Sequence, residues 1–322
     1  MSVFVRAAHR GENHWAFYLL TVLVVFIGYV IGQVPLLLVL NEKVDSGNIS
    51  REQAAAFFEN ADFSQIGMSS HVGLLLLLGS FIAAAILLFI CVEFIHKRAF
   101  RTLIRANKQV NVRKLLVAFG LWFVLTALAE FVAYLIYPGA YTFHFNWQNW
   151  LPLLAISLLI LPIQTSFEEV FTRGYLLQGI GSATGSQIAA VMGSSLVFAA
   201  MHLANPEVRE FGLVVMMFYY LSVAISLAII TLLDDGLEYA LGIHAATNVY
   251  GASFVSFEGS ALRTDTLLQV EQVDPLLMLI LFYVTMAIFF VIIHKTFKLK
   301  PLRSLLSRVA PDLPEQQSDD HL

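Results

Sequence analysis

Charged residues and cysteine are both scarce in this sequence of 322 residues. Asp, Glu, Lys and Arg together make up 13% of it, whereas hydrophobic residues make up 58%. Soluble globular domains average about 25% charged residues, so the composition excludes an ordinary soluble protein and predicts a polytopic membrane protein. The single cysteine, Cys91, lies within an apolar run, which excludes an intramolecular disulfide framework.

Several short functional motifs are missing as well. Neither the HExxH nor the CxxC metal-binding pattern occurs, and there is no Gly-rich phosphate loop. The two halves of the chain share no visible repeat, which argues against an inverted-repeat transporter.

The apolar residues gather in eight segments, and a helix needs about 20 such residues to cross a bilayer. The pattern predicts an all-α fold, a polytopic transmembrane helical bundle with about eight spans. The first segment is too long for a signal peptide and no small-residue cleavage site follows it, so we expect it to be retained. The predicted spans are residues 15–40, 71–95, 115–137, 150–178, 186–203, 211–233, 237–256 and 275–293.

Loop charges predict the orientation of the bundle. The loop at 41–70 is mainly acidic, whereas 96–114 carries seven Lys and Arg residues and no Asp or Glu. Because cytoplasmic loops are enriched in Lys and Arg, we expect this basic loop and both termini in the cytoplasm. The chain is compact and has no obvious organelle signal, so a bacterial inner membrane is the expected location. The basic loop is either an amphipathic stretch on the anionic leaflet or a plain positive-inside loop.

Four regions follow from these patterns. Residues 1–149 hold the N-terminal transmembrane helices and the basic loop, and residues 150–256 hold the candidate catalytic core. Residues 257–300 hold the last transmembrane helix. The polar end, 301–322, contains "APDLPEQQSDDHL" and is expected to be disordered.

Three ionisable residues stand out in "SFEEVFTRGYLL", residues 166–177, at the end of an apolar span. Each such group inside a membrane costs about 2.5–3.5 kcal/mol, so it marks a functional site by default. Glu169 and Arg173 are spaced to form an i,i+4 ion pair. Glu168 is rotated by about 100° from Glu169, so it can face a cavity while Glu169 holds the arginine.

Glu93 and Glu130 are the other acidic residues inside predicted spans. Glu93 lies beside His96, Lys97 and Arg98 at the end of its span, where it can pair or reach the interface. Glu130 is isolated in "TALAEFVAYL" and can hydrogen-bond a neighbouring helix. We expect a structural role for both.

Two histidines and an asparagine complete the candidate site. His202 ends the fifth span, and a hairpin turn at 179–186 brings it to about the same depth as Glu168 at ~1.5 Å per helical residue. His244 and Asn248 are four residues apart on the seventh span, so they point into one cavity. The structural alternative is that each histidine only makes a hydrogen bond between helices. The occurrence of four polar residues on three predicted helices, Glu168, His202, His244 and Asn248, argues against it.

At these positions the sequence resembles the CPBP or Abi family, which comprises CAAX prenyl endopeptidases and bacteriocin-processing or immunity proteins. That family carries EExxxR, FxxxH and HxxxN or HxxxD motifs in this order. The matching residues are Glu168-Glu169-x-x-x-Arg173, Phe198-x-x-x-His202 and His244-x-x-x-Asn248.

The resemblance implies a metal-free intramembrane glutamate endopeptidase that hydrolyses a peptide bond without a cofactor. Glu168 would be the general base that activates water, and His202 would orient that water. His244 and Asn248 would stabilise the oxyanion of the tetrahedral intermediate.

The resemblance further implies that Glu169 and Arg173 brace the site. Water has to reach it, so we expect a hydrated cavity open toward the cytoplasm. The expected partners are membrane lipid and a peptide or membrane-protein substrate, lipid-modified in the eukaryotic CAAX enzymes and cut near its C-terminus. No nucleic acid is expected.

Three alternatives stay open at the level of sequence. A zinc hydrolase could use Glu168, His202 and His244 as ligands, although Asn248 would then have no obvious role. A non-enzymatic immunity or scaffold protein could use the same residues for binding. A transporter could use them as a proton relay.

Overall fold

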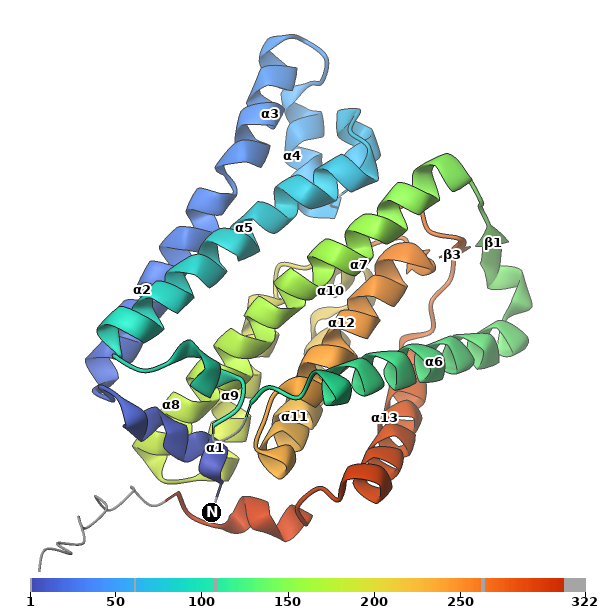
Figure 1. The fold of residues 1–322 in the computed structure, drawn as a ribbon. Helices are drawn as coiled ribbons and strands as arrows, with labels where there is room; N and C mark the ends of the chain where they lie inside the picture. Colours follow the sequence, from blue (N-terminus) through green and yellow to red (C-terminus); the bar gives the residue numbers. More distant parts are fainter. Residues whose placement is uncertain (1, 61, 107–108, 262–263, 310–322) are drawn as a thin grey trace, which may run out of the picture.

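The computed structural model describes residues 2–60, 62–106, 109–261 and 264–309 (Figure 1). It is a bundle of α-helices with one small sheet, which confirms the all-α membrane fold. The helices are α1 Val3–Arg6, α2 Trp15–Gly32, α3 Val34–Asp45, α4 Arg51–Asn60, α5 Ser70–Ile90, α6 Val112–Ile136, α7 Trp147–Glu169, α8 Leu177–Thr184, α9 Gln187–Met201, α10 Pro206–Phe211, α11 Leu213–Asp234, α12 Glu238–Ser253 and α13 Pro275–Phe297.

All eight predicted spans contain helix, but two are shorter than expected. In the described part of the chain, six helical segments are long and apolar enough to cross a membrane. α9 has 15 residues and α12 has 16, which is below the about 20 residues that a span needs. α12 is buried along most of its length, so it packs inside the bundle between α6 and α7 rather than against lipid.

Local signals in the sequence set several helix ends. The side chain of Asn146 accepts from the backbone N–H of Gln148 at the start of α7. Asp274 accepts from the first backbone N–H groups of α13, and Ser186 caps α9 in the same way. Such caps satisfy donors that a helix leaves without intrahelical partners.

The small sheet has the strand order β1-β3-β2 and joins loops that are distant in sequence. β1 (Tyr141–Phe143) pairs antiparallel with β3 (Leu268–Val270), which pairs parallel with β2 (Val255–Phe257). In Figure 1 the sheet lies far from the N-terminus, at the end of the bundle where α7 begins.

The N-terminus and the chain after α13 meet at the other end of the bundle. The N–H of Val309 donates to the carbonyl of Gly185 at 2.9 Å, and α1 packs against α8. Part of the predicted disordered tail is therefore ordered, because Leu302–Leu306 forms the 3-10 helix η7 and Gln187 donates to the carbonyls of Ser304 and Ser307. Residues 310–322 of that prediction lie outside the described residues.

The described part of the basic loop packs against the helical bundle, and its placement on the anionic leaflet stays a prediction. Two of its cations form ion pairs with acidic residues at the adjoining ends of α11 and α12. Arg105 lies 3.0 Å from Asp234 and 3.2 Å from Glu238, and Lys114 also pairs with Asp234. The loop thus holds acidic residues at the end of the bundle that contains the N-terminus.

Close glycine packing joins α2 to α5. Gly28 and Gly32 form a GxxxG pattern, which allows two helix backbones to approach in a membrane. A Cβ atom added at Gly32 would lie 2.5 Å from both the carbonyl oxygen of Gly79 and the Cα of Ser80. Only glycine fits at this contact.

Substituting Gly32→Ala is expected to lower the free energy of unfolding by about 1–3 kcal/mol, because backbone atoms must move to admit the methyl group. Denaturant unfolding of the purified protein in mixed micelles measures this. Gly120→Ala is the matched control, since a Cβ there meets open space on α6 and alanine gains about 0.5–1 kcal/mol in a helix. Equal stability of the two variants would contradict the packing.

Candidate active site

The glutamate segment lies where α7 departs from regular helical geometry. Pro162 is inside α7, and the π-helix η6 (Val170–Leu176) begins directly after Glu169. Proline removes an intrahelical hydrogen bond, and π-turns often accompany functional sites. Glu168 and Glu169 therefore lie on a short segment between a proline and a π-helix.

Glu169 is the centre of a buried charged cluster. Its Oε1 accepts from Arg173 Nη1 at 2.9 Å and contacts His244 Nδ1 at 2.7 Å. Glu169 and Arg173 are fully buried and form the ion pair that their spacing predicts. An ionised carboxylate can only accept, so we assign the proton to Nδ1 of His244.

Glu168 approaches the opposite edge of the same imidazole. Its Oε2 lies 3.5 Å from His244 Nε2, and its Oε1 accepts from Gln164 Nε2 at 3.0 Å. Both carboxylates thus contact one histidine, so Glu168 does not turn away from Glu169 as far as the sequence suggests. The backbone carbonyl of Glu168 accepts from the Thr172 hydroxyl at 2.5 Å.

His202 is held beside this cluster by aromatic packing. Its Nδ1 lies 2.8 Å from the backbone carbonyl of Phe198, which can only accept, so this nitrogen carries the proton. The Phe198 ring lies 4.4 Å from the His202 ring, 5.9 Å from the His244 ring and 3.9 Å from the guanidinium carbon of Arg173. Phe198 therefore connects the three motifs.

Tyr220 on α11 supports His202 from the other side. The two ring centroids are 4.7 Å apart. The Tyr220 hydroxyl accepts from Asn205 at 3.2 Å and donates to Glu207 at 3.4 Å. Glu207 lies outside the candidate spans, and burial raises its pKa. These contacts connect the packed rings of Phe198, His202 and Tyr220 to α10 and to the loop before it.

Asn248 lies one helical turn beyond His244 on α12. Its Nδ2 is 3.5 Å from Gln164 Oε1, so it reaches the cluster through Gln164. Of the predicted site residues, Glu168, Glu169, Arg173 and His244 contact one another directly, while His202 and Asn248 join through other side chains.

Sequence reasoning missed two neighbours of the site. Gln164 stands four residues before Glu168, on the same helix face, and this spacing could have revealed it. Tyr220 has no comparable signal, because its contact with His202 depends on how α9 and α11 pack.

Glu93 and Glu130 have partners that suit structural roles. Glu93 Oε1 accepts from the backbone N–H of Phe100 at 2.6 Å. Glu130 Oε1 accepts from the hydroxyl of Tyr141 at 2.5 Å, which connects α6 to β1.

The zinc alternative requires three protein ligands around one point. Within the described ranges, no group of three or more His, Cys, Asp or Glu side chains is arranged to hold a metal ion. Zinc held by Glu168, His202 and His244 stays an alternative, and chelation tests it.

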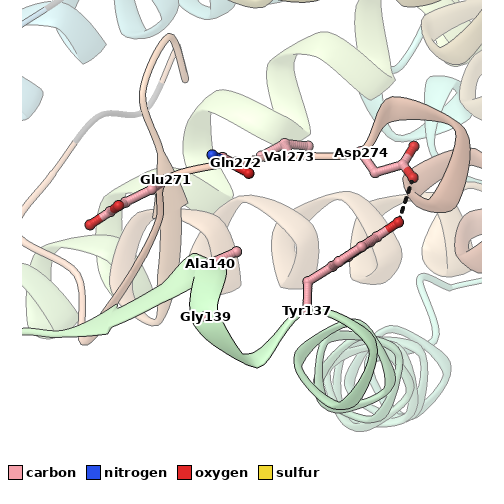
Figure 2. A pocket seen from close by; sticks show the side chains of 7 residues that line it. All are labelled: Tyr137, Gly139, Ala140, Glu271, Gln272, Val273 and Asp274. Atoms are coloured by element: carbon pink, nitrogen blue, oxygen red, sulfur yellow. Dashed lines mark hydrogen bonds between the residues drawn. The ribbon is translucent and has the colours of Figure 1, made fainter.

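Two cavities lie near the sheet rather than at Glu168. One, of about 460 Å³, is lined by residues of the η5 turn (Pro138–Ala140) and of the 271–274 loop, and Figure 2 shows Tyr137 donating to Asp274 at its edge. The second is lined by residues 256–258 and 269–272. A hydrated cavity that opens from Glu168 to the cytoplasm stays a prediction.

Comparisons with known proteins agree with the three motifs. The family model described as type II CAAX prenyl endopeptidase Rce1-like matches residues 146–250. A Bacillus subtilis (strain 168) protein, the uncharacterized protein YyaK, is 29% identical over 262 residues, which is 81% of this chain and 84% of that protein. No solved structure matches the chain significantly.

The matched region runs from the start of α7 into α12 and contains all six predicted site residues. This part of the chain is therefore similar to the Rce1-like family of type II CAAX prenyl endopeptidases, in agreement with the resemblance that the motifs carry, and the chain around it is that of a multi-pass membrane protein.

Proposed function

We propose that this protein is a metal-free glutamate endopeptidase that hydrolyses a peptide bond inside the membrane. The observation that carries the proposal is the placement of His244 between two carboxylates. Glu169 lies 2.7 Å from its Nδ1 and Glu168 lies 3.5 Å from its Nε2.

Charge balance favours one mobile proton in this cluster. Arg173 compensates Glu169, and burial in a low-dielectric interior penalises any remaining net charge. The cluster is neutral when Glu168 and His244 share a single additional proton. When that proton is on His244, Glu168 is ionised and can act as a base, and the Nε2–H of His244 can donate a hydrogen bond. One protonation state of the cluster therefore supplies both a general base and an oxyanion donor.

Hydrolysis then follows in two steps. Glu168 takes a proton from water as the water oxygen attacks the peptide carbonyl carbon, which forms a tetrahedral intermediate. The C–N bond breaks as Glu168 returns the proton to the leaving amine, and the products are a new carboxyl end and a new amino end. General acid–base catalysis of this type contributes about 10²–10⁴-fold in rate.

His202, His244 and Asn248 assist these two chemical steps. With its proton on Nδ1, His202 has an unprotonated Nε2 that can accept a hydrogen bond from the attacking water. His244 and Asn248 donate to the developing oxyanion, and one such donor is worth about 10²–10³-fold in kcat in soluble hydrolases.

The proposed substrate is a peptide or membrane-protein tail that is cleaved near its C-terminus, with or without a lipid modification. The proposed setting is a bacterial inner membrane with both termini in the cytoplasm. α1 and Val309 lie at the same end of the bundle, which supports placing the two termini on one side of the membrane.

The substitution Glu168→Gln is expected to lower kcat by at least 100-fold, because the amide keeps the size of the side chain but cannot take the proton. Release of the C-terminal tripeptide from a farnesylated CAAX peptide by the purified protein measures this. The peptide without its farnesyl group tests the requirement for a lipid.

Glu130→Gln is the matched control, since it also neutralises a carboxylate within a span and the amide oxygen still accepts from Tyr141. Its activity should remain near that of wild type. Equal cleavage by Glu168→Gln and wild type would contradict the protease proposal and favour a binding role. Cleavage of neither peptide by wild type would contradict a CAAX-type peptide as the substrate.

Chelation should leave the activity unchanged. Prolonged dialysis against EDTA and 1,10-phenanthroline, followed by the same tripeptide assay, tests this. Loss of activity that zinc restores would contradict the metal-free mechanism and support the hydrolase with Glu168, His202 and His244 as ligands.

A further inference from the structure

We propose that Gln164 is the positioning residue of Glu168, and that Asn248 acts on Glu168 through it. In this arrangement the Gln164 amide holds one oxygen of the carboxylate, so that the other oxygen takes the proton. The inference rests on the proposed function of Glu168 as general base and assigns a role to a residue outside the three motifs.

The contacts of Gln164 suit only an amide. Its Nε2 donates to Glu168 Oε1 at 3.0 Å, and its Oε1 lies 3.5 Å from Asn248 Nδ2. An amide has both a donor and an acceptor, whereas an ionised carboxylate has no donor and an apolar side chain has neither. Asn248 therefore orients the Gln164 amide so that its N–H faces Glu168.

The bond to Gln164 makes the two oxygens of Glu168 different. Oε1 is occupied by the amide. Oε2 is buried, has no hydrogen-bond partner in the described structure, and lies 3.5 Å from His244 Nε2. The oxygen beside His244 is the one left for water, so Gln164 selects which oxygen reacts.

The same link also fixes how α7 and α12 lie against each other. Glu169 contacts His244, and about one turn further along both antiparallel helices Gln164 contacts Asn248. These contacts define the register of the two helices together with the 3.5 Å contact between Glu168 and His244 and the hydrogen bond from Trp150 Nε1 to the carbonyl of Ser253. The carboxylates and the donor residues are thereby kept in one geometry.

The test uses the full-length protein in liposomes and the farnesylated CAAX peptide as the probe. Gln164→Met preserves the length of the side chain and removes both hydrogen bonds. We expect kcat to fall about 10–100-fold with KM changed by less than about twofold, since a hydrogen bond to a charged group is lost while substrate contacts remain. Gln148→Met, at an exposed position of the same helix, is the matched control and should be unaffected.

The pH profile separates positioning from a general structural effect. A carboxylate that loses a hydrogen bond to its charged form holds its proton more tightly. The low-pH limb of kcat/KM should therefore move to higher pH by about 0.5–1 unit in Gln164→Met. Gln164→Asn, whose amide is too short to reach Glu168, should shift the limb in the same direction and serves if the methionine variant does not fold.

The role of Asn248 is tested by combining substitutions. Asn248→Ala should reduce kcat at least threefold less in the Gln164→Met background than in wild type, because its route to Glu168 is already broken. Equal losses in the two backgrounds would refute the link.

Failure of this inference is distinguishable from failure of the protease proposal. A wild-type kcat and pH profile for folded Gln164→Met, together with inactive Glu168→Gln, would overturn the positioning role and leave the protease proposal intact. Full activity of Glu168→Gln would overturn the protease proposal itself.

Discussion

The buried ion pair between Glu169 and Arg173 is the interaction on which the rest of the site depends. Neither side chain is exposed, and loss of one partner would leave an uncompensated charge in a low-dielectric interior, which typically costs about 3–5 kcal/mol. The pair keeps Glu169 ionised, so Glu169 fixes the Nδ1 proton of His244 and turns Nε2 toward Glu168. A glutamate that looks redundant in the sequence therefore determines the protonation state of the histidine beside the proposed base.

The side chains of the site lie on backbone that departs from regular α-helical geometry. Pro162 and the π-helix η6 flank the two glutamates, and α12 runs antiparallel to α7 with His244 facing them. Phe198 packs on Arg173, His202 and His244, so one aromatic ring sets the position of three polar groups. The apolar ring keeps the surroundings of the Glu169–Arg173 pair low in dielectric constant, which strengthens the electrostatic interaction between them.

Spacing along the chain could predict the helical bundle, the three motifs and the Glu169–Arg173 pair, since each depends on helix periodicity and hydrophobicity. It could not predict that α12 is short, because a helix buried inside a bundle need not match the membrane thickness. The pairing of Arg105 with Asp234 joins residues far apart in sequence, and the contact of Asn248 with Gln164 depends on side-chain rotamers. Both are consequences of packing rather than of pattern.

The proposed role of Glu168 as the general base of a protease is tested most directly in cells. Mass spectrometry would compare the C-terminal ends of membrane proteins and peptides in cells that carry wild type and in cells that carry Glu168→Gln. Cleaved ends should be present with wild type and absent with the variant at equal expression. An identical set of ends in both would contradict it.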